Sequence, residues 1–175
     1  ERLLDELKKL FKSNILTKLS NDKFSLELFE IIFPQLKNLK KFSNPNYFAK
    51  NKIQEADIIF LLSVLIIDST DNADYFLYKF NISKKDHKRV KTIDDFYKNK
   101  ISSKSFSENN LNKIFYFKGR QSLIDILSFR IFTSRKVDNN ILKFIEQFQS
   151  RELPSMPYGA KFLMEKYQIS EGKSL

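Results

Sequence analysis

The stretch IIFLLSVLII, residues 58–67, is the longest apolar run of the 175-residue chain and is interrupted only by Ser63. It has about half the length that a helix needs to cross a bilayer, so we expect a buried helix rather than a membrane span. A helix that is apolar on all sides belongs at the centre of a globular protein. The run therefore predicts a central helix over residues 53–69, around which the remaining chain packs.

Apolar residues on both sides of this run recur at helical spacing. At the N-terminal end, Leu3, Leu7, Leu10 and Phe11 form one stripe. No segment shows a convincing strand pattern, and no repeat of fixed period is present. Residues 42–51 are expected to be a loop and residues 100–107 a polar linker. Further helices are expected over 23–33, 74–80, 84–99, 110–120, 121–135, 138–150 and from about residue 160. The sequence predicts an all-α fold, an irregular bundle of about eight to ten helices without a sheet.

Several polar residues stand where helices are expected to begin or end. Asp22 and Asp138 precede helical segments and are candidate N-caps. Ser83 is followed three positions later by Asp86, the spacing of a capping box. Gly119 interrupts a helical pattern, so we expect it to end a helix or to mark a tight junction between two helices.

The composition excludes several kinds of catalytic site. The chain has no cysteine, one histidine (His87) and three glycines, which argues against thiolate chemistry, zinc clusters, a serine–histidine triad and glycine-rich phosphate loops. We expect His87 to be a surface residue and no metal site in this chain. Nothing near Glu1 resembles a signal peptide, so we expect a cytoplasmic protein.

Two groups of carboxylates are candidates for metal or acid–base chemistry. Asp68, Asp71 and Asp74 recur at a spacing of three residues, which allows a site for divalent ions, although such a group more often solvates the junction of two helices. Asp94 and Asp95 are neighbours and are expected to point to different faces of one helix. The sequence therefore favours a chain that does no chemistry itself.

The positive charge is concentrated in one part of the chain. The formal net charge is +10, and residues 84–120 contribute +7 of it through eleven Lys and Arg against four Asp and Glu. A local excess of this kind favours a polyanionic partner. We divide the chain into residues 1–80, a helical body, and residues 81–175, a basic helical region. The alternative is coding bias, because Lys, Asn, Ile and Phe are abundant whereas Ala and Gly are scarce.

Three segments together resemble one protein family. The C-terminal segment carries Pro157, Lys161, Leu163 and Met164, followed by residues 171–175 (EGKSL). Residues 1–7 (ERLLDEL) and 28–34 (LFEIIFP) supply two further elements in the same order. This set resembles the neck-end, body and tail of bacterial class II tRNA nucleotidyltransferases (CCA-adding enzymes) and poly(A) polymerases. Phe162 departs from the family pattern, which has Asp at that place.

The resemblance implies a role for the chain and for its partners. In this family the body and tail bind tRNA, while a catalytic head adds nucleotides to RNA 3′ ends without a template, using Mg²⁺ with ATP or CTP. No head motif occurs here, so this chain is expected to bind tRNA or other RNA, to need no cofactor, to be inactive alone and to have no membrane partner. Glu1 and Arg2 match the neck motif that braces the head, which is the second expected partner, in the same or a separate chain.

Basic residues on helices would hold RNA phosphates without reading bases. The candidate RNA contacts are Lys84, Lys85, Lys88, Arg89, Lys91, Lys118, Arg120, Arg130, Arg135, Arg151, Lys161 and Tyr158. The rings of Tyr47, Tyr97, Tyr116 and Tyr158 can stack on unpaired bases, but most aromatic residues at helical spacing belong to the core, so we expect this role only for Tyr158. Two other functions stay open: a helical protein-interaction module, and an independent enzyme that uses Asp68, Asp71 and Asp74.

Overall fold

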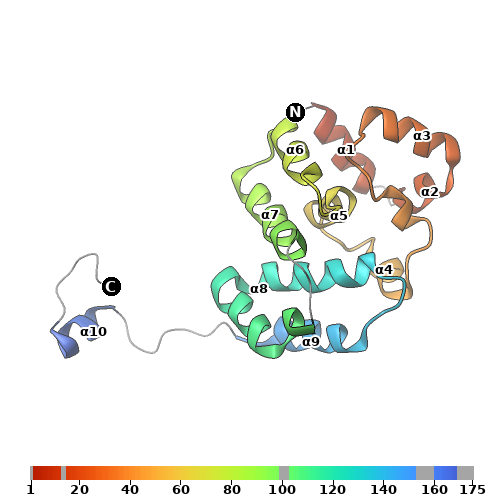
Figure 1. Cartoon of the computed structure of the whole chain (residues 1–175). Coiled ribbons are helices and arrows are strands. Elements are labelled where there is room, and N and C mark those ends of the chain that lie inside the picture. The colour runs from red at the N-terminus through yellow and green to blue at the C-terminus, as the bar shows by residue number, and fades with distance from the viewer. Residues whose placement is uncertain (1, 13–14, 99–102, 153–159, 169–175) are drawn as a thin grey trace.

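The computed structural model describes residues 2–12, 15–98, 103–152 and 160–168. These ranges contain ten α-helices, two short 3₁₀ helices and no strand, which confirms the all-α prediction (Figure 1). The α-helices are α1 (Arg2–Lys12), α2 (Leu16–Asn21), α3 (Lys23–Ile32), α4 (Tyr47–Lys52), α5 (Ile58–Ile66), α6 (Asn72–Lys79), α7 (Lys84–Lys98), α8 (Glu108–Thr133), α9 (Asn139–Ser150) and α10 (Ala160–Tyr167). The 3₁₀ helices are η1 (Leu39–Phe42) and η2 (Ser103–Phe106).

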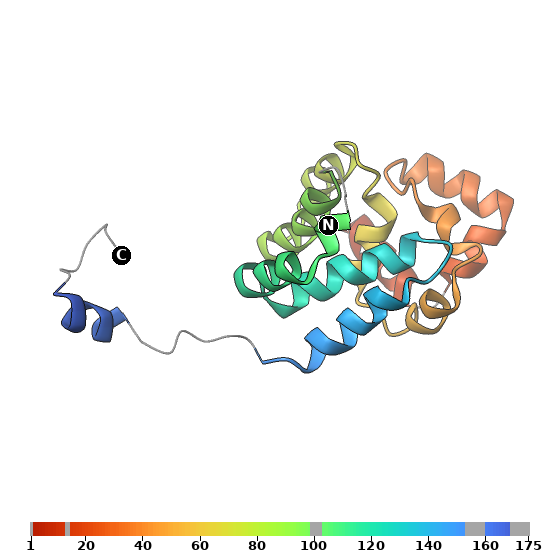
Figure 2. The ribbon, with the colours of Figure 1, turned by 60° about the horizontal axis from the view of Figure 1, so that its bottom comes forward.

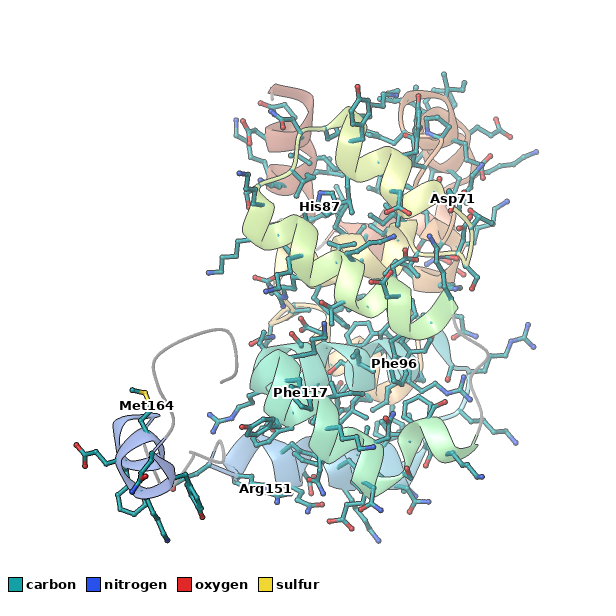
Figure 3. The ribbon with its side chains drawn as sticks, turned by 60° about the vertical axis from the view of Figure 1, so that its left-hand side comes forward. Asp71, His87, Phe96, Phe117, Arg151 and Met164 are labelled. Carbon is teal, nitrogen blue, oxygen red and sulfur yellow. The ribbon has the colours of Figure 1, made fainter. Side chains whose placement is uncertain are left out.

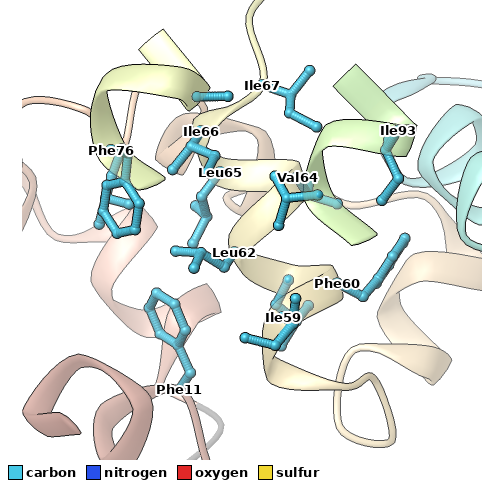
Figure 4. Packing of buried hydrophobic residues seen from close by; sticks show 14 of the residues in the cluster. Phe11, Ile59, Phe60, Leu62, Val64, Leu65, Ile66, Ile67, Phe76 and Ile93 are labelled. Carbon is cyan, nitrogen blue, oxygen red and sulfur yellow. The ribbon is translucent and has the colours of Figure 1, made fainter. Parts of the chain in front are cut away.

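Helix α5 is the centre of the larger hydrophobic core, as the apolar run predicts. Every residue from Ile59 to Ile66 is buried. Phe11 from α1, Phe76 from α6 and Ile93 from α7 surround it (Figure 4). The predicted start at residue 53 is wrong. The helix begins at Ile58 because the Asp57 carboxylate caps it, accepting hydrogen bonds from the backbone N–H groups of Ile59 and Phe60.

The prediction of a loop over residues 42–51 is also wrong, because this segment contains the start of α4. The Asn46 side chain caps the helix by accepting a hydrogen bond from the backbone N–H of Ala49. Its amide group also donates to the carbonyl oxygens of Ile131 and Ser134, at 2.7 and 2.8 Å. The position of this cap therefore depends on partners at the C-terminal end of α8, and the sequence around Asn46 does not reveal these contacts.

Helix α8 belongs to both hydrophobic clusters of the described chain. Phe132 lies in the larger cluster, where its ring meets that of Phe60 edge to face at 5.0 Å. Phe115 lies in the smaller cluster and packs against Phe148 of α9, with ring centroids 5.2 Å apart. In Figure 1, α8 accordingly runs between α5 and α7 on one side and α9 on the other.

Gly119 divides α8 into two segments, which confirms the predicted junction. Its backbone angles, φ 84° and ψ 169°, are not helical. This region of backbone space is essentially restricted to glycine. A side chain at this position would meet no atom within 4 Å, so the backbone conformation rather than lack of space requires a glycine.

The predicted caps are present. The Asp22 and Asp138 carboxylates accept hydrogen bonds from the backbone N–H groups of Ser25 and Asn140. The Ser83 hydroxyl donates to the Asp86 carboxylate and accepts a hydrogen bond from the backbone N–H of Asp86. Helix α10 begins at Ala160 as expected and lies away from the other helices in both views (Figure 2). Among the helices described here, none is both long enough and apolar enough to cross a membrane.

Candidate nucleic-acid interface

A groove of about 300 Å³ opens between α7 and the first segment of α8. Its lining is mostly cationic and polar. The lining residues are Lys84, His87, Lys88, Lys91, Thr92, Asp95 and Lys118. Four of the twelve predicted RNA contacts therefore come together in one hollow. Figure 3 views the molecule from this side, with His87 labelled on α7.

Three lysines of the groove have free ammonium groups. Lys84, Lys88 and Lys118 are exposed. Among the described residues they take part in no ion pair. Lys84 and Lys88 are one helical turn apart, so their side chains share a face of α7. Lys118 adds a third charge from α8. Three uncompensated cations around one hollow favour the binding of a polyanion.

Lys91, by contrast, is held by carboxylates at the edge of the groove. Its ammonium group contacts Asp74 at 2.7 Å and Asp94 at 3.3 Å. Lys98 binds the same two carboxylates, at 3.1 and 3.0 Å. Asp94 is fully buried and its neighbour Asp95 is exposed, as expected for different faces, but both carboxylates reach the Lys91 ammonium group, Asp95 at 3.5 Å. This lysine–aspartate cluster joins α6 to α7.

The cluster shifts the acid–base behaviour of its members. The hydrogen bond from Lys91 holds the pKa of Asp74 below its ordinary value, against a smaller opposing effect of burial. The hydrogen bond to Asp94 raises the pKa of Lys98. Both shifts favour the charged forms. Asp71 also contacts Lys98, at 3.3 Å, and Asp68 accepts a hydrogen bond from Thr70 at 2.6 Å.

These contacts argue against a metal site at Asp68, Asp71 and Asp74. Lysine ammonium groups already neutralise Asp71 and Asp74. Among the residues that the structure describes, no group of His, Asp or Glu is arranged to hold a metal ion. Asp74 instead joins α6 to the basic helix α7 through Lys91 and Lys98.

We expect the stabilising effect of Asp74 to disappear at acid pH. A lowered pKa in the folded state means that the carboxylate stabilises the fold above its unfolded pKa, 3.8, and loses this effect as the pH falls through the folded value. The wild-type protein should therefore be more stable than Asp74→Asn at neutral pH, and the difference in their free energies of unfolding should disappear below pH 3.8. Urea unfolding across this range measures the difference. Asp71→Asn is the control: Asp71 is 98% exposed, so this substitution should change the free energy of unfolding little at neutral pH.

Arg89 is engaged inside the protein and does not line the groove. Its guanidinium donates two hydrogen bonds to Asp125, at 2.6 and 3.0 Å, and one to Asp57 at 2.7 Å. The Gln121 side chain donates to the same Asp125 carboxylate. Partial burial lowers the pKa of Arg89, but the hydrogen bonds and charges of Asp125 and Asp57 together outweigh it, so the pKa is raised. The structure thus gives this predicted RNA contact a structural role between α5, α7 and α8.

The other predicted contacts lie elsewhere. Arg120 donates to the backbone oxygen of Arg151, and Arg151 donates to Asn112. Arg135 lines a different hollow, of about 620 Å³, with Lys40 and Lys41. Lys85 and Arg130 are exposed outside the groove. Glu1 and Tyr158 fall outside the described residues, and Arg2 and Lys161 are described only as members of α1 and α10.

The aromatic residues divide into core and surface. Tyr97 is part of the core: its hydroxyl donates to the backbone oxygen of Ile126, its ring packs on Phe129, and burial raises its pKa. Tyr47 and Tyr116 are exposed. Phe117 is also exposed, at 76%, directly before Lys118. Sequence reasoning missed it, because an apolar residue in a helical pattern is normally assigned to the core.

No family model, no curated protein and no solved structure matches this chain.

Proposed function

We propose that this chain is an RNA-binding, noncatalytic region that serves a template-independent nucleotidyltransferase and holds the backbone of tRNA or another RNA. One observation carries the RNA-binding part: Lys84, Lys88 and Lys118 surround one groove and have no carboxylate partner among the described residues. Lysines placed in this way neutralise phosphates and release condensed counterions, so the affinity should fall steeply with salt.

The nucleotidyltransferase part rests on the resemblance of the N-terminal, LFEIIFP and C-terminal segments to the family of CCA-adding enzymes and poly(A) polymerases. The chemistry would then belong to a catalytic head, in the same or a separate chain, that uses Mg²⁺ with ATP or CTP. With Mg²⁺, ATP and CTP, we expect this chain by itself to add no nucleotide to a tRNA that lacks its 3′ end.

The test of RNA binding removes the three free lysines. We expect Lys84→Ala/Lys88→Ala/Lys118→Ala to bind labelled tRNA about tenfold or more weakly than the wild type at moderate salt. The slope of log K against log salt should fall in magnitude by roughly two to three, because each phosphate contact contributes about one. Fluorescence anisotropy titrations at several salt concentrations measure both quantities.

A matched variant controls for net charge. Lys37→Ala/Lys50→Ala/Lys143→Ala removes the same number of exposed lysines from other faces, so its tRNA affinity should stay close to that of the wild type. Equal losses in the two triple variants would show that total charge, rather than the groove, governs binding. The absence of tRNA binding by the wild type even at low salt would contradict the proposal.

A second candidate, a protein-interaction module, is favoured by the outer face of α3. This helix has no buried residue. Phe24 and Ile31 are 73% and 77% exposed, and Leu28 and Ile32 lie on the same helix with exposed side chains. An apolar face of this kind is typical of a surface that meets another protein. This function predicts that a partner protein binds through α3 with an affinity that does not depend on salt. Substitution of the groove lysines should leave that affinity unchanged.

A further inference from the structure

The exposed aromatic pair beside the groove suggests a ligand more specific than an RNA backbone. Tyr116 and Phe117 are 52% and 76% exposed. Their rings meet edge to face with centroids 5.0 Å apart. Tyr116 thus supports the ring of Phe117 from one side, while most of the Phe117 side chain stays open to solvent. Such solvent exposure of two adjacent aromatic rings is unfavourable unless a ligand covers them.

The surroundings of the pair are cationic. Residues 111–120 (LNKIFYFKGR) contain Lys113, Lys118 and Arg120 and no carboxylate. Lys118, the next residue after Phe117, also lines the lysine groove. Figure 3 shows Phe117 on α8 on the same side of the molecule as His87 of the groove. A ligand that reaches from the groove to Phe117 must therefore combine negative charge with a flat apolar surface.

A nucleotide whose base is unpaired has this combination. Its phosphate can bind the lysines, and its base has a π face that can stack on an aromatic ring. The charge of the neighbourhood favours this ligand over an apolar protein side chain, which would leave the cations around Phe117 without a partner. A base inside a duplex cannot stack in this way, because both of its faces are already covered.

We infer that Phe117, supported by Tyr116, stacks on an unpaired base of the RNA whose backbone lies in the groove, so that the preferred ligand is a junction of duplex and single strand. This inference rests on the proposed RNA-binding function. It adds a binding site for one class of base, the unpaired one, to a groove that otherwise recognises only phosphates.

Three hairpin RNAs with the same stem test the inference. One is blunt, one carries a short single-stranded 3′ tail, and one carries the same tail without bases. The two tailed RNAs have equal numbers of phosphates, so only stacking distinguishes them. We expect the full 175-residue chain to bind the base-bearing tail roughly 5- to 150-fold more tightly than the abasic tail.

Substitutions of Phe117 identify the stacking residue. Phe117→Ala and Phe117→Leu should abolish the advantage of the base-bearing tail, whereas Phe117→Trp should keep it. Because the side chain is exposed, all three variants should unfold at the same urea concentration as the wild type. Loss of the advantage in the first two variants and its retention in Phe117→Trp supports the inference.

Two other outcomes overturn it in different ways. If the wild type binds the stem but shows no advantage for bases, or if Phe117→Ala keeps the advantage, the stacking site does not exist while the proposed function stands. Phe117 would then be a contact for a protein partner or a ring without a ligand. If none of the three RNAs binds, the proposed function and the stacking site both fail.

Discussion

Arg89→Ala should lower the free energy of unfolding by about 3–5 kcal/mol. The substitution leaves the Asp125 carboxylate, whose side chain is only 4% exposed, without its bidentate partner. An uncompensated buried charge is the main cost of breaking such a pair. Asp57 loses a partner as well, although it keeps its hydrogen bonds at the start of α5. Urea unfolding followed by circular dichroism measures the change.

Two further variants separate charge from packing at Arg89. Lys88→Ala removes a charge at the preceding, exposed position and should change the stability by less than about 0.5 kcal/mol. Arg89→Met/Asp125→Leu removes both charges of the pair and should recover much of the stability lost in Arg89→Ala, because apolar residues of similar size often replace buried ion pairs without loss. If Arg89→Ala proved as stable as Lys88→Ala, the structural role of Arg89 would be wrong.

Phe148→Ala should also lower the free energy of unfolding by about 3–5 kcal/mol, since it removes a fully buried aromatic side chain. The ring packs on Phe115, and the Arg151 guanidinium lies 5.6 Å from its centroid. Phe148 is one of eight buried residues in the smaller cluster, so the cavity removes a large part of the contact between α8 and α9. We expect α9 to separate from α8 before the larger core unfolds.

Hydrogen exchange distinguishes local from global loss in this variant. Amide protons of α9 should exchange much faster in Phe148→Ala, while those of α5, in the larger core, should change less. Gln147→Ala, one residue earlier and exposed, is the control and should leave both helices protected. Unchanged protection of α9 in Phe148→Ala would show that the smaller cluster does not depend on this ring.

The features that the sequence predicted correctly depend on residues close together in the chain. The caps at Asp22 and Asp138 and the Ser83–Asp86 pair bond to atoms two or three positions away. The junction at Gly119 depends only on the backbone angles of that one residue. The burial of α5 followed from an apolar run with no polar face. Local chemistry decides such features, so a single sequence is sufficient to predict them.

The features that could not be predicted depend on contacts between distant residues. Arg89 and Asp125 are 36 positions apart, and Asn46 bonds to oxygens 85 and 88 positions away. The same limit applies to the groove. Charge density indicated a basic region, but only the fold shows that carboxylates neutralise Lys91 and Arg89 while Lys84 and Lys88 remain free. Sequence alone treated all four as equivalent.

The lysine groove contains the single histidine of the chain. An imidazole ring has proton resonances that stand apart from most others in an NMR spectrum, and here every such signal comes from His87. A sample prepared without a polyhistidine tag therefore carries its own spectroscopic label in the groove, and no resonance assignment is needed to follow it. Any molecule that enters the groove changes the chemical environment of that one ring.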